Sequence, residues 1–316
     1  MRWNDRIGRR IKLSDLHILL AVAQSGSMSR AANALAVSHP VVSRSISDLE
    51  HALGVRLLER TRRGVELTEP GRAMLNRSYA AFDELREGVK DIELLTDPAA
   101  GEVRIGTTPP LAASFLATVV DRMVKRYPRM VFHIVIDDGE RHRTGLSDRR
   151  LDLLVFRKST TPAHELNFET LFESQYVVAA GKDNSWVGRR RVTLADLAGE
   201  NWAFPESDDT FGSFVRDAFR ASGLAVPHAR IVTAALEMRA NLLRTGRYLT
   251  MLPDFWLQFP ETHPFIRRLP VELPITAGPI GIVTLKERTP SPPVQRFIEC
   301  AREVAKPLAT RKQLKR

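Results

Sequence analysis

The feature that most constrains this chain is a series of short apolar stripes near its start, each with the 3- and 4-residue spacing of a helix. Their members are Leu16, Leu19, Leu20 and Ala23; Ala31, Ala32 and Leu35; and Val42, Ile46, Leu49 and Leu53. Gly26 and Gly54 end the first and third stripes, and Ser27 and Ser38 offer hydroxyls that can cap the second and third helices. Because Ala31 and Ala32 in the second stripe are small, its helix can approach the first closely, and the sequence predicts a helix-turn-helix.

The face of the third helix opposite its apolar stripe is polar and carries short side chains. This face and the start of the helix contain Ser38, His39, Pro40, Ser43, Arg44 and Ser47. Recognition helices contact bases near their N-termini. The Ser43 and Ser47 hydroxyls can reach phosphates, and Arg44 can donate two hydrogen bonds to a guanine edge. We predict that this face reads DNA; a plain solvated face is the alternative.

A hairpin pattern follows the third helix. Val55–Arg60 alternates like a strand, Thr61–Gly64 supplies a turn that contains Arg62 and Arg63, and Val65–Thr68 returns. A helix-turn-helix followed by a hairpin with a basic tip is a winged helix, whose arginines can enter the negative potential of a minor groove. The hairpin therefore favours the interpretation that the polar face of the third helix binds double-stranded DNA over the interpretation that it is merely solvated.

The distribution of charge supports a DNA-binding end. The chain has 316 residues and a net charge of +10. Residues 1–70 hold 11 basic and 7 acidic side chains, residues 71–100 hold 4 and 6, residues 101–301 hold 26 and 23, and residues 302–316 hold 6 and 1. The two ends are basic and the middle is nearly balanced, as expected for a DNA-binding end attached to a nearly neutral body. The basic tail is interpreted as a solvated end rather than a site.

A long helix is predicted after the hairpin, with Thr68, Glu69 and Pro70 in its first turn. Its apolar positions span about three heptads and are Leu75, Ser78, Phe82, Leu85, Val89 and Ile92. We predict pairing of this stripe with a second copy, which would set two recognition helices in adjacent major grooves. Burial against the protein's own body is the alternative. The segment 97–101 is expected to end the helix and form a hinge.

From Glu102 onward, strands alternate with helices, which predicts a parallel sheet with helices on both sides. The expected strands are Val103–Gly106, Met130–Ile136, Leu151–Phe156, Tyr176–Ala180, Trp202–Phe204, Arg230–Thr233, Leu249–Leu252, Phe265–Val271 and Ile280–Leu285. The expected helices are Leu111–Arg126, Arg141–Arg150, Thr210–Ala221, Ala235–Thr245 and Pro293–Ala305. Crossings near 170–175 and 270–275 would make two lobes around a cleft.

The predicted organisation is an α/β multi-domain chain. It comprises a winged helix-turn-helix over 1–70, a linker and dimerisation helix with hinge over 71–100, and a two-lobed α/β domain over 101–316. Lobe I is expected over about 101–172 and 274–306, and lobe II over about 173–273.

Candidate ligand positions lie where strands of an open α/β sheet end and helices begin. Thr107 and Thr108 follow the first expected strand, Arg157 follows the third, and 208–211 opens a helix of the second lobe. Hydroxyls with an arginine suit a carboxylate or phosphate, whereas Asp208, Asp209 and Trp202 suit a sugar, and the sequence leaves both open. Helix capping and, for Arg157, an interdomain ion pair are the structural alternatives.

A family resemblance is carried by the run SMSRAANALAVSHPVVSRSISDLEHALGVRLLERTRRGVELTEPG. This run resembles the N-terminal domain of the LysR-type transcriptional regulators. Its specific motifs are AA…L…S-x-P-x-V-S-R…LE…LG and L-x-E-R-x-x-x-G-V-x-L-T-x-x-G, and the likeness covers residues 13 to about 95. His39 stands where the family usually has Gln, which puts the base preference at this position in question.

The resemblance implies a dimerising linker helix and a C-terminal two-lobed effector domain like a periplasmic binding protein. Effector contacts are carried over to Thr107, Thr108, Arg157, Thr210 and Phe211, and Asp208 joins the predicted effector site from its place at the start of the same helix. The segments IGTTPPLAASFL, TGRYLTMLP and TLKERTPSPPVQRFIECAREVAKPLA are most similar to the galactose-binding-protein regulator subgroup. The implied dimerisation positions are Leu75, Phe82, Leu85, Val89 and Ile92.

The expected function is that of a sequence-specific transcriptional regulator whose promoter activity responds to a small molecule bound between the two lobes. The effector is expected to be a sugar, a sugar acid or another organic acid. The chain is expected to form a homodimer or homotetramer, and RNA polymerase is a further candidate partner. A solute-binding protein or small-molecule enzyme built on the two-lobed domain is the alternative.

Several absences from the sequence narrow the function further. The chain has no Gly-rich phosphate loop, HExxH or GxSxG motif, so we predict no enzyme, catalytic residue, metal or cofactor. Cys300 is the only cysteine, so an internal disulfide is excluded. We expect Cys300 to be a buried structural thiol. The early apolar run, Ile18–Ala23, is far shorter than the roughly 20 residues that a membrane span needs. A cytoplasmic protein without membrane contact is predicted.

Overall fold

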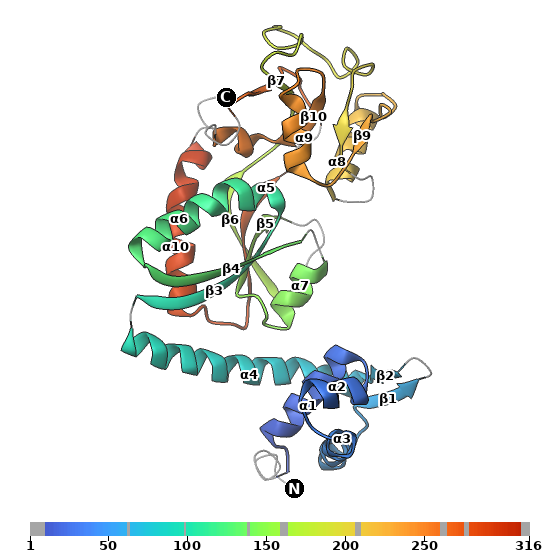
Figure 1. The fold of residues 1–316 in the computed structure, drawn as a ribbon, viewed down its shortest axis with the longest axis vertical. Helices are drawn as coiled ribbons and strands as arrows, with labels where there is room; N and C mark the ends of the chain where they lie inside the picture. The colour runs from blue at the N-terminus through green and yellow to red at the C-terminus, as the bar shows by residue number, and fades with distance from the viewer. Residues whose placement is uncertain are drawn as a thin grey trace. The chain divides into compact units, whose positions relative to one another are not determined.

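A computed structural model of the chain describes residues 10–61, 64–97, 99–137, 140–158, 164–205, 210–259, 264–274 and 278–310 (Figure 1). The chain separates into two compact units. The first comprises Met1–Ile92 with Ser147–Arg149, and the second comprises Glu93–Leu146 with Arg150–Arg316. Three predicted site residues, Arg62, Arg63 and Asp208, lie outside the described residues.

The first unit has the predicted order of short helices, hairpin and long helix. Its elements are α1 (Leu13–Ser25), α2 (Met28–Ala34), α3 (His39–Leu53), β1 (Leu58–Thr61), β2 (Gly64–Leu67) and α4 (Glu69–Thr96). The predicted stripes meet in one core, in which Leu19, Val42 and Leu49 are fully buried. Burial of these side chains holds the short helices together, because helices of this length are marginal in isolation.

The two predicted serine caps differ in outcome. The Ser27 hydroxyl accepts a hydrogen bond from the Arg30 N–H at 3.5 Å, as predicted. Ser38 is the N-cap residue of α3, as predicted, but its side chain makes no capping hydrogen bond. Pro40 has no N–H to donate, and the Val41 N–H donates to the Ser38 carbonyl instead.

Two glycines bring the hairpin against the turn between α1 and α2. The Val65 N–H donates to the Gly26 carbonyl at 3.2 Å. Gly26 and Gly64 have φ values of +64° and +134°, which disfavour any other residue. A Cβ atom on Gly64 would lie 2.5 Å from the Gly26 oxygen. Glycine at these positions therefore lets the backbones meet directly.

The second unit contains, in its described residues, a five-stranded sheet of order β4-β3-β5-β12-β6. Its strands are β3 (Ala100–Thr107), β4 (Arg129–Ile136), β5 (Leu153–Arg157), β6 (Leu166–Glu173) and β12 (Pro279–Leu285). Strand β3 is parallel to β4 and β5, but β12 is antiparallel to β5 and β6. The expected parallel pairing is therefore present among β4, β3 and β5, and the expectation is wrong for β12 and β6. The chain leaves this sheet along β6 and returns along β12, so the neighbouring strands run in opposite directions.

The helices of this sheet are α5 (Pro109–Leu111), η2 (Ala112–Leu116), α6 (Ala117–Arg126), α7 (Glu140–Ser147) and α10 (Pro292–Thr310). The helix predicted over Leu111–Arg126 is present, but η2 winds it more loosely as a π-helical turn. The Ser114 hydroxyl donates to the Pro110 carbonyl at 2.7 Å within this region. Helix α10 packs on β6 and α6, as Figure 1 shows.

The remaining strands of the second unit form two smaller sheets among the described residues. The first has the order β10-β7-β11, with β7 (Tyr176–Gly181), β10 (Leu249–Pro253) and β11 (Ile266–Arg268). The second pairs β8 (Ala203–Phe204) with β9 (Ile231–Val232) in parallel. The accompanying helices are α8 (Thr210–Ala221), α9 (Leu236–Leu243) and η3 (Asp254–Gln258).

Strand β7 is buried on both faces and joins two hydrophobic cores. Val177 and Ala179 belong to the core that the five-stranded sheet shares with α9 and α10. Val178 and Ala180 belong to the core built around Trp202 and α8. Because successive side chains of a strand point to opposite faces, one strand serves both cores.

The start of α4 provides a test of the packing. The Gly71 N–H donates to the Thr68 hydroxyl at 3.0 Å, and a Cβ atom on Gly71 would lie 2.0 Å from the Leu57 carbonyl oxygen. A Cβ atom on Gly88, in the same helix, would meet no atom within 4 Å. We expect Gly71→Ala to destabilise the first unit by about 1–3 kcal/mol and Gly88→Ala to stabilise it by about 0.5–1 kcal/mol.

Urea unfolding of the full chain, followed by circular dichroism, measures both variants. Equal stabilities of Gly71→Ala and the wild type would contradict the close packing of α4 on Leu57.

Candidate DNA interface and effector site

Helix α3 presents the residues predicted to read DNA on one outward face. Ser38, His39, Pro40, Arg44 and Ser47 are exposed, and Ser43 is half-buried. The opposite face packs into the core of the first unit. The structure therefore gathers these hydroxyl, imidazole and guanidinium groups on the surface of a single helix.

Two partly buried attachments fix the orientation of α3. The Ser45 hydroxyl donates to Asp15 Oδ1 on α1 at 2.6 Å. Glu50 Oε1 accepts hydrogen bonds from the backbone N–H groups of Leu57 at 2.7 Å and Leu58 at 3.1 Å, at the start of the hairpin. Sequence analysis missed both attachments. A signal for Glu50 was available, since it is a carboxylate directly after the buried Leu49.

The hairpin is paired along its described length. Its register runs from Leu58 opposite Leu67 to Thr61 opposite Gly64. The predicted minor-groove arginines, Arg62 and Arg63, stand between those last two residues in the sequence and outside the described residues. The structure therefore describes the two strands that flank the predicted wing tip.

The stripe predicted along α4 has two parts. Leu75 and Phe82 are half-buried against the core of the first unit, and the rings of Phe82 and His17 are 5.7 Å apart. Leu85, Val89 and Ile92 are 52%, 56% and 65% exposed. The first part therefore packs against its own unit, and the second part presents aliphatic side chains to solvent.

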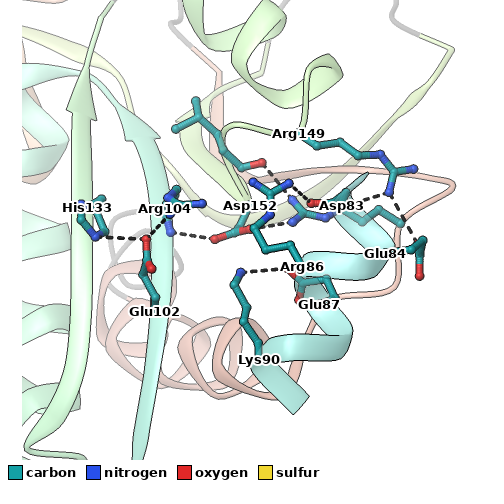
Figure 2. A network of polar contacts seen from close by, with 12 residues as sticks. Asp83, Glu84, Arg86, Glu87, Lys90, Glu102, Arg104, His133, Arg149 and Asp152 are labelled. Atoms are coloured by element: carbon teal, nitrogen blue, oxygen red, sulfur yellow. Dashed lines mark hydrogen bonds and ion pairs between the residues drawn. The ribbon is translucent and has the colours of Figure 1, made fainter. Parts of the chain in front are cut away.

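Two charged side chains, Asp83 and Lys90, are buried on α4, and each has partners of opposite charge (Figure 2). The carboxylate of Asp83 is fully buried and accepts from Arg86 at 2.6 Å and from Arg149 at 2.9 Å. Lys90 donates to Glu87 at 2.8 Å. A buried carboxylate is costly unless it is paired, and the two guanidinium groups supply the pairing.

A second polar network joins the beginnings of β3 and β5 (Figure 2). Asp152 accepts from the Arg104 N–H at 2.7 Å and from Arg288 Nη2 at 2.7 Å. Glu102 pairs with Arg104 at 2.5 Å and lies 3.1 Å from His133 Nε2. The candidate effector residues lie at the carboxyl ends of these strands. This network therefore stabilises the sheet on the side away from those residues.

The carboxyl ends of β3 and β5 lie side by side. Thr107 pairs with Val155 across the sheet, and its hydroxyl donates to the Val155 carbonyl at 2.9 Å. Thr107 is fully buried, whereas Thr108 is half-buried and precedes α5. Thr108 is thus the more accessible of the two threonines.

Arg157 is held at the segments that cross between the sheets. Its Nη1 donates to the Ser174 carbonyl at 3.0 Å and to the Gly278 carbonyl at 2.6 Å. Its guanidinium carbon lies 5.1 Å from the centre of the Tyr176 ring. The side chain is therefore fixed by backbone carbonyls and an aromatic face.

Neighbouring groups extend this site in ways that sequence analysis did not find. The rings of Tyr176 and Phe214 are 4.2 Å apart, which places α8 beside the residue that packs on Arg157. Asp254 Oδ1 accepts from the Ser174 hydroxyl at 2.9 Å and the Gln175 N–H at 3.1 Å. No periodic signal marks Asp254. Thr210 and Phe211 begin α8, and their side chains lie outside the described residues, as does Asp208.

The single cysteine has the predicted structural environment. Cys300 on α10 is buried, and its Sγ lies 3.8 Å from the Val119 carbonyl oxygen. Burial raises the pKa of the thiol, which keeps it protonated at neutral pH. In the described residues, no group of His, Cys, Asp and Glu side chains could hold a metal. None of the helices in the same residues has the length and apolar character for a membrane crossing.

Two family models match the chain and together cover most of it. The model for a bacterial regulatory helix-turn-helix protein of the lysR family matches residues 13–72, and that for a LysR substrate binding domain matches residues 96–306. The chain belongs to the LysR family of transcriptional regulators. The family resemblance and the fold class predicted from the sequence are thereby confirmed. The LysR-family regulator is a sequence-specific DNA-binding protein with a domain for a small-molecule effector.

Relatives and solved structures agree with this assignment. The LysR-family chain is 26% identical to the regulator TdcA of Escherichia coli (strain K12), over 92% of this chain and 93% of TdcA. It is 27% identical to the regulator PcaQ of Agrobacterium fabrum (strain C58 / ATCC 33970), over 95% and 96%.

Two solved structures share the fold at lower identity. A full-length OxyR variant from Pseudomonas aeruginosa matches with a TM-score of 0.65 and 19% identity, over 94% of this chain and 95% of that one. CbnR complexed with its target DNA matches with a TM-score of 0.53 and 22% identity, over 93% and 100%.

Proposed function

We propose that this regulator reads its operator with the exposed face of α3. The observation that carries the proposal is the separation of the helix into a core face and an exposed face that bears Ser38, His39, Pro40, Ser43, Arg44 and Ser47. Arg44 donates to a guanine edge, the serine hydroxyls contact phosphates, and Arg62 and Arg63 enter a minor groove. The working units are 1–70 for DNA, 71–100 for pairing and 101–316 for the effector.

Replacing the guanine-reading arginine tests this orientation of α3. Arg44→Ala should cost about 1–3 kcal/mol at one base pair of each half-site, because a bidentate contact is lost. Arg62→Ala is the control and should weaken binding to all sequences alike, because phosphate and groove-potential contacts carry little base information.

Footprinting and gel-shift titration against single-base variants of an operator selected by the full chain measure both variants. Unchanged sequence preference in Arg44→Ala would contradict the proposed orientation.

The exposed part of α4 supports assembly of two copies. Leu85, Val89 and Ile92 present an aliphatic row to water, and a second copy of the helix would bury it at coiled-coil spacing. Leu75 and Phe82 pack against the core of the first unit, so they anchor the helix that carries the aliphatic row. The edge strand β4 exposes a further aliphatic set, Val131, Ile134, Val135 and Ile136, which could join such dimers into a homotetramer.

A charge in the aliphatic row should break the pair. Val89→Glu is expected to shift the full chain toward monomer, since a carboxylate would be buried without a partner at the helix seam. Asp91→Ala, on the same helix, is the control and should leave the mass unchanged. Light scattering coupled to size-exclusion chromatography gives the mass directly. An unchanged assembly in Val89→Glu would place the dimer contact elsewhere.

For the effector, we propose an organic anion held near Arg157, Thr108 and the start of α8. The fixed guanidinium supplies charge, and Thr108, half-buried beside Thr107, supplies a hydroxyl; Asp208, Thr210 and Phe211 would complete the site. This favours a sugar acid or another carboxylate over a neutral sugar. The assignment to the galactose-binding-protein regulator subgroup rests on the sequence segments alone.

The regulator acts in the cytoplasm, where RNA polymerase is its candidate partner at the promoter, and no catalytic role is assigned to it. These statements follow from the role of a promoter-bound regulator.

A thermal-shift screen of sugars, sugar acids and aromatic acids on the full chain tests the effector proposal. An effector at 100 times its Kd should add about 2.7 kcal/mol of stability. Arg157→Gln and Thr108→Val should remove the shift, whereas Arg302→Gln, which breaks an exposed pair with Glu169, should keep it. Stabilisation only by neutral sugars, or full shifts in both site variants, would overturn the anion proposal.

A further inference from the structure

Helix α3 carries an apolar side chain on its DNA-reading surface that the proposed polar contacts do not use. Val41 is 48% exposed and is, among the described residues of α3, the large hydrophobic residue that faces solvent. It stands in the first turn of the helix, directly after the exposed His39 and Pro40. Residues in this turn of a recognition helix are the ones that approach base edges.

The chemistry of the major groove limits what such a side chain can contact. Phosphates, sugar oxygens and the polar edges of bases offer hydrogen bonds, which a valine cannot make. The apolar group on the floor of the major groove is the C5-methyl group of thymine. Burial of Val41 against that methyl removes two apolar surfaces from water at once.

The position of Val41 relative to Arg44 fixes where this thymine lies. Residues three apart on a helix are neighbours, with Cβ atoms about 5–6 Å apart. Stacked bases are about 3.4 Å apart along each strand. The two side chains therefore reach bases that are one or two steps apart.

We propose that Val41 is a specificity-determining residue that reads the methyl group of a thymine one or two base pairs from the guanine read by Arg44. This inference rests on the proposed DNA-reading face and adds the base class that the face selects at a second position. His39 and the serines set polar contacts on either side, and Val41 supplies an apolar contact next to Pro40.

The experiment removes the methyl group from the DNA and the matching side chain from the protein. An operator is first selected from random duplexes with the full-length chain. Each thymine is then replaced by uracil, which lacks the C5-methyl group and keeps the hydrogen-bonding edge. One thymine per half-site should respond, with a loss of about fourfold in affinity for the burial of one methyl group. Replacement in both half-sites should cost about sixteenfold.

The protein variants assign that loss to Val41. In Val41→Ala the uracil effect at this thymine should disappear, and the guanine that depends on Arg44 should still be required. Val55→Ala is the matched control, because Val55 is 45% exposed and follows the other end of α3. It should keep the wild-type uracil profile.

The outcomes separate this inference from the proposed function. Identical uracil profiles in the wild type and Val41→Ala, or a responsive thymine more than two steps from the guanine, would overturn the role of Val41 and leave DNA reading by α3 in place. Failure of the full chain to select any sequence would overturn the proposed function itself.

Discussion

The geometry of the DNA-binding unit depends on one carboxylate oxygen, Glu50 Oε1, which accepts the backbone N–H groups of Leu57 and Leu58. A charged acceptor satisfies two donors more strongly than a neutral group would. Glu50 lies on the recognition helix and the two donors begin the hairpin, so these bonds set the angle between the two parts that meet DNA. On the opposite side of the hairpin, the contact between Val65 and Gly26 fixes the same strands against α1. The wing is thus held from both sides by hydrogen bonds to its backbone.

The sequence predicted this unit well because its information is local. Helical spacing, Ser27 and the glycines at 26 and 54 each act within a few residues, and the structure follows them. Ser38 shows the limit, since it is the N-cap residue of α3 but the Val41 N–H donates to its carbonyl rather than to its hydroxyl. The direction of β12 depends on a return from a distant part of the chain, which no local pattern encodes. Strand β6 was missed as well, because its half-buried residues alternate weakly.

The two candidate sites also differ in how far local sequence patterns predict them. The exposed face of α3 follows from periodicity, so its residues could be listed in advance. Around Arg157, the anchoring carbonyls of Ser174 and Gly278 come from segments far apart in sequence, and Asp254 acts through both a hydroxyl and an N–H. The stripe on α4 was predicted as one surface, but tertiary packing divides it between Phe82, which contacts the core, and Leu85, which faces water.

The two-sided burial of β7 has a mechanical consequence. A shift of this strand by one residue would exchange Val177 with Val178 and Ala179 with Ala180 between the two cores. Such a slip would disrupt both cores together, so the burial of both faces fixes the register of β7. Any opening and closing of the lobes around an effector must be absorbed by rotation of the short crossing segments, where Ser174 and Gln175 are bonded to Asp254.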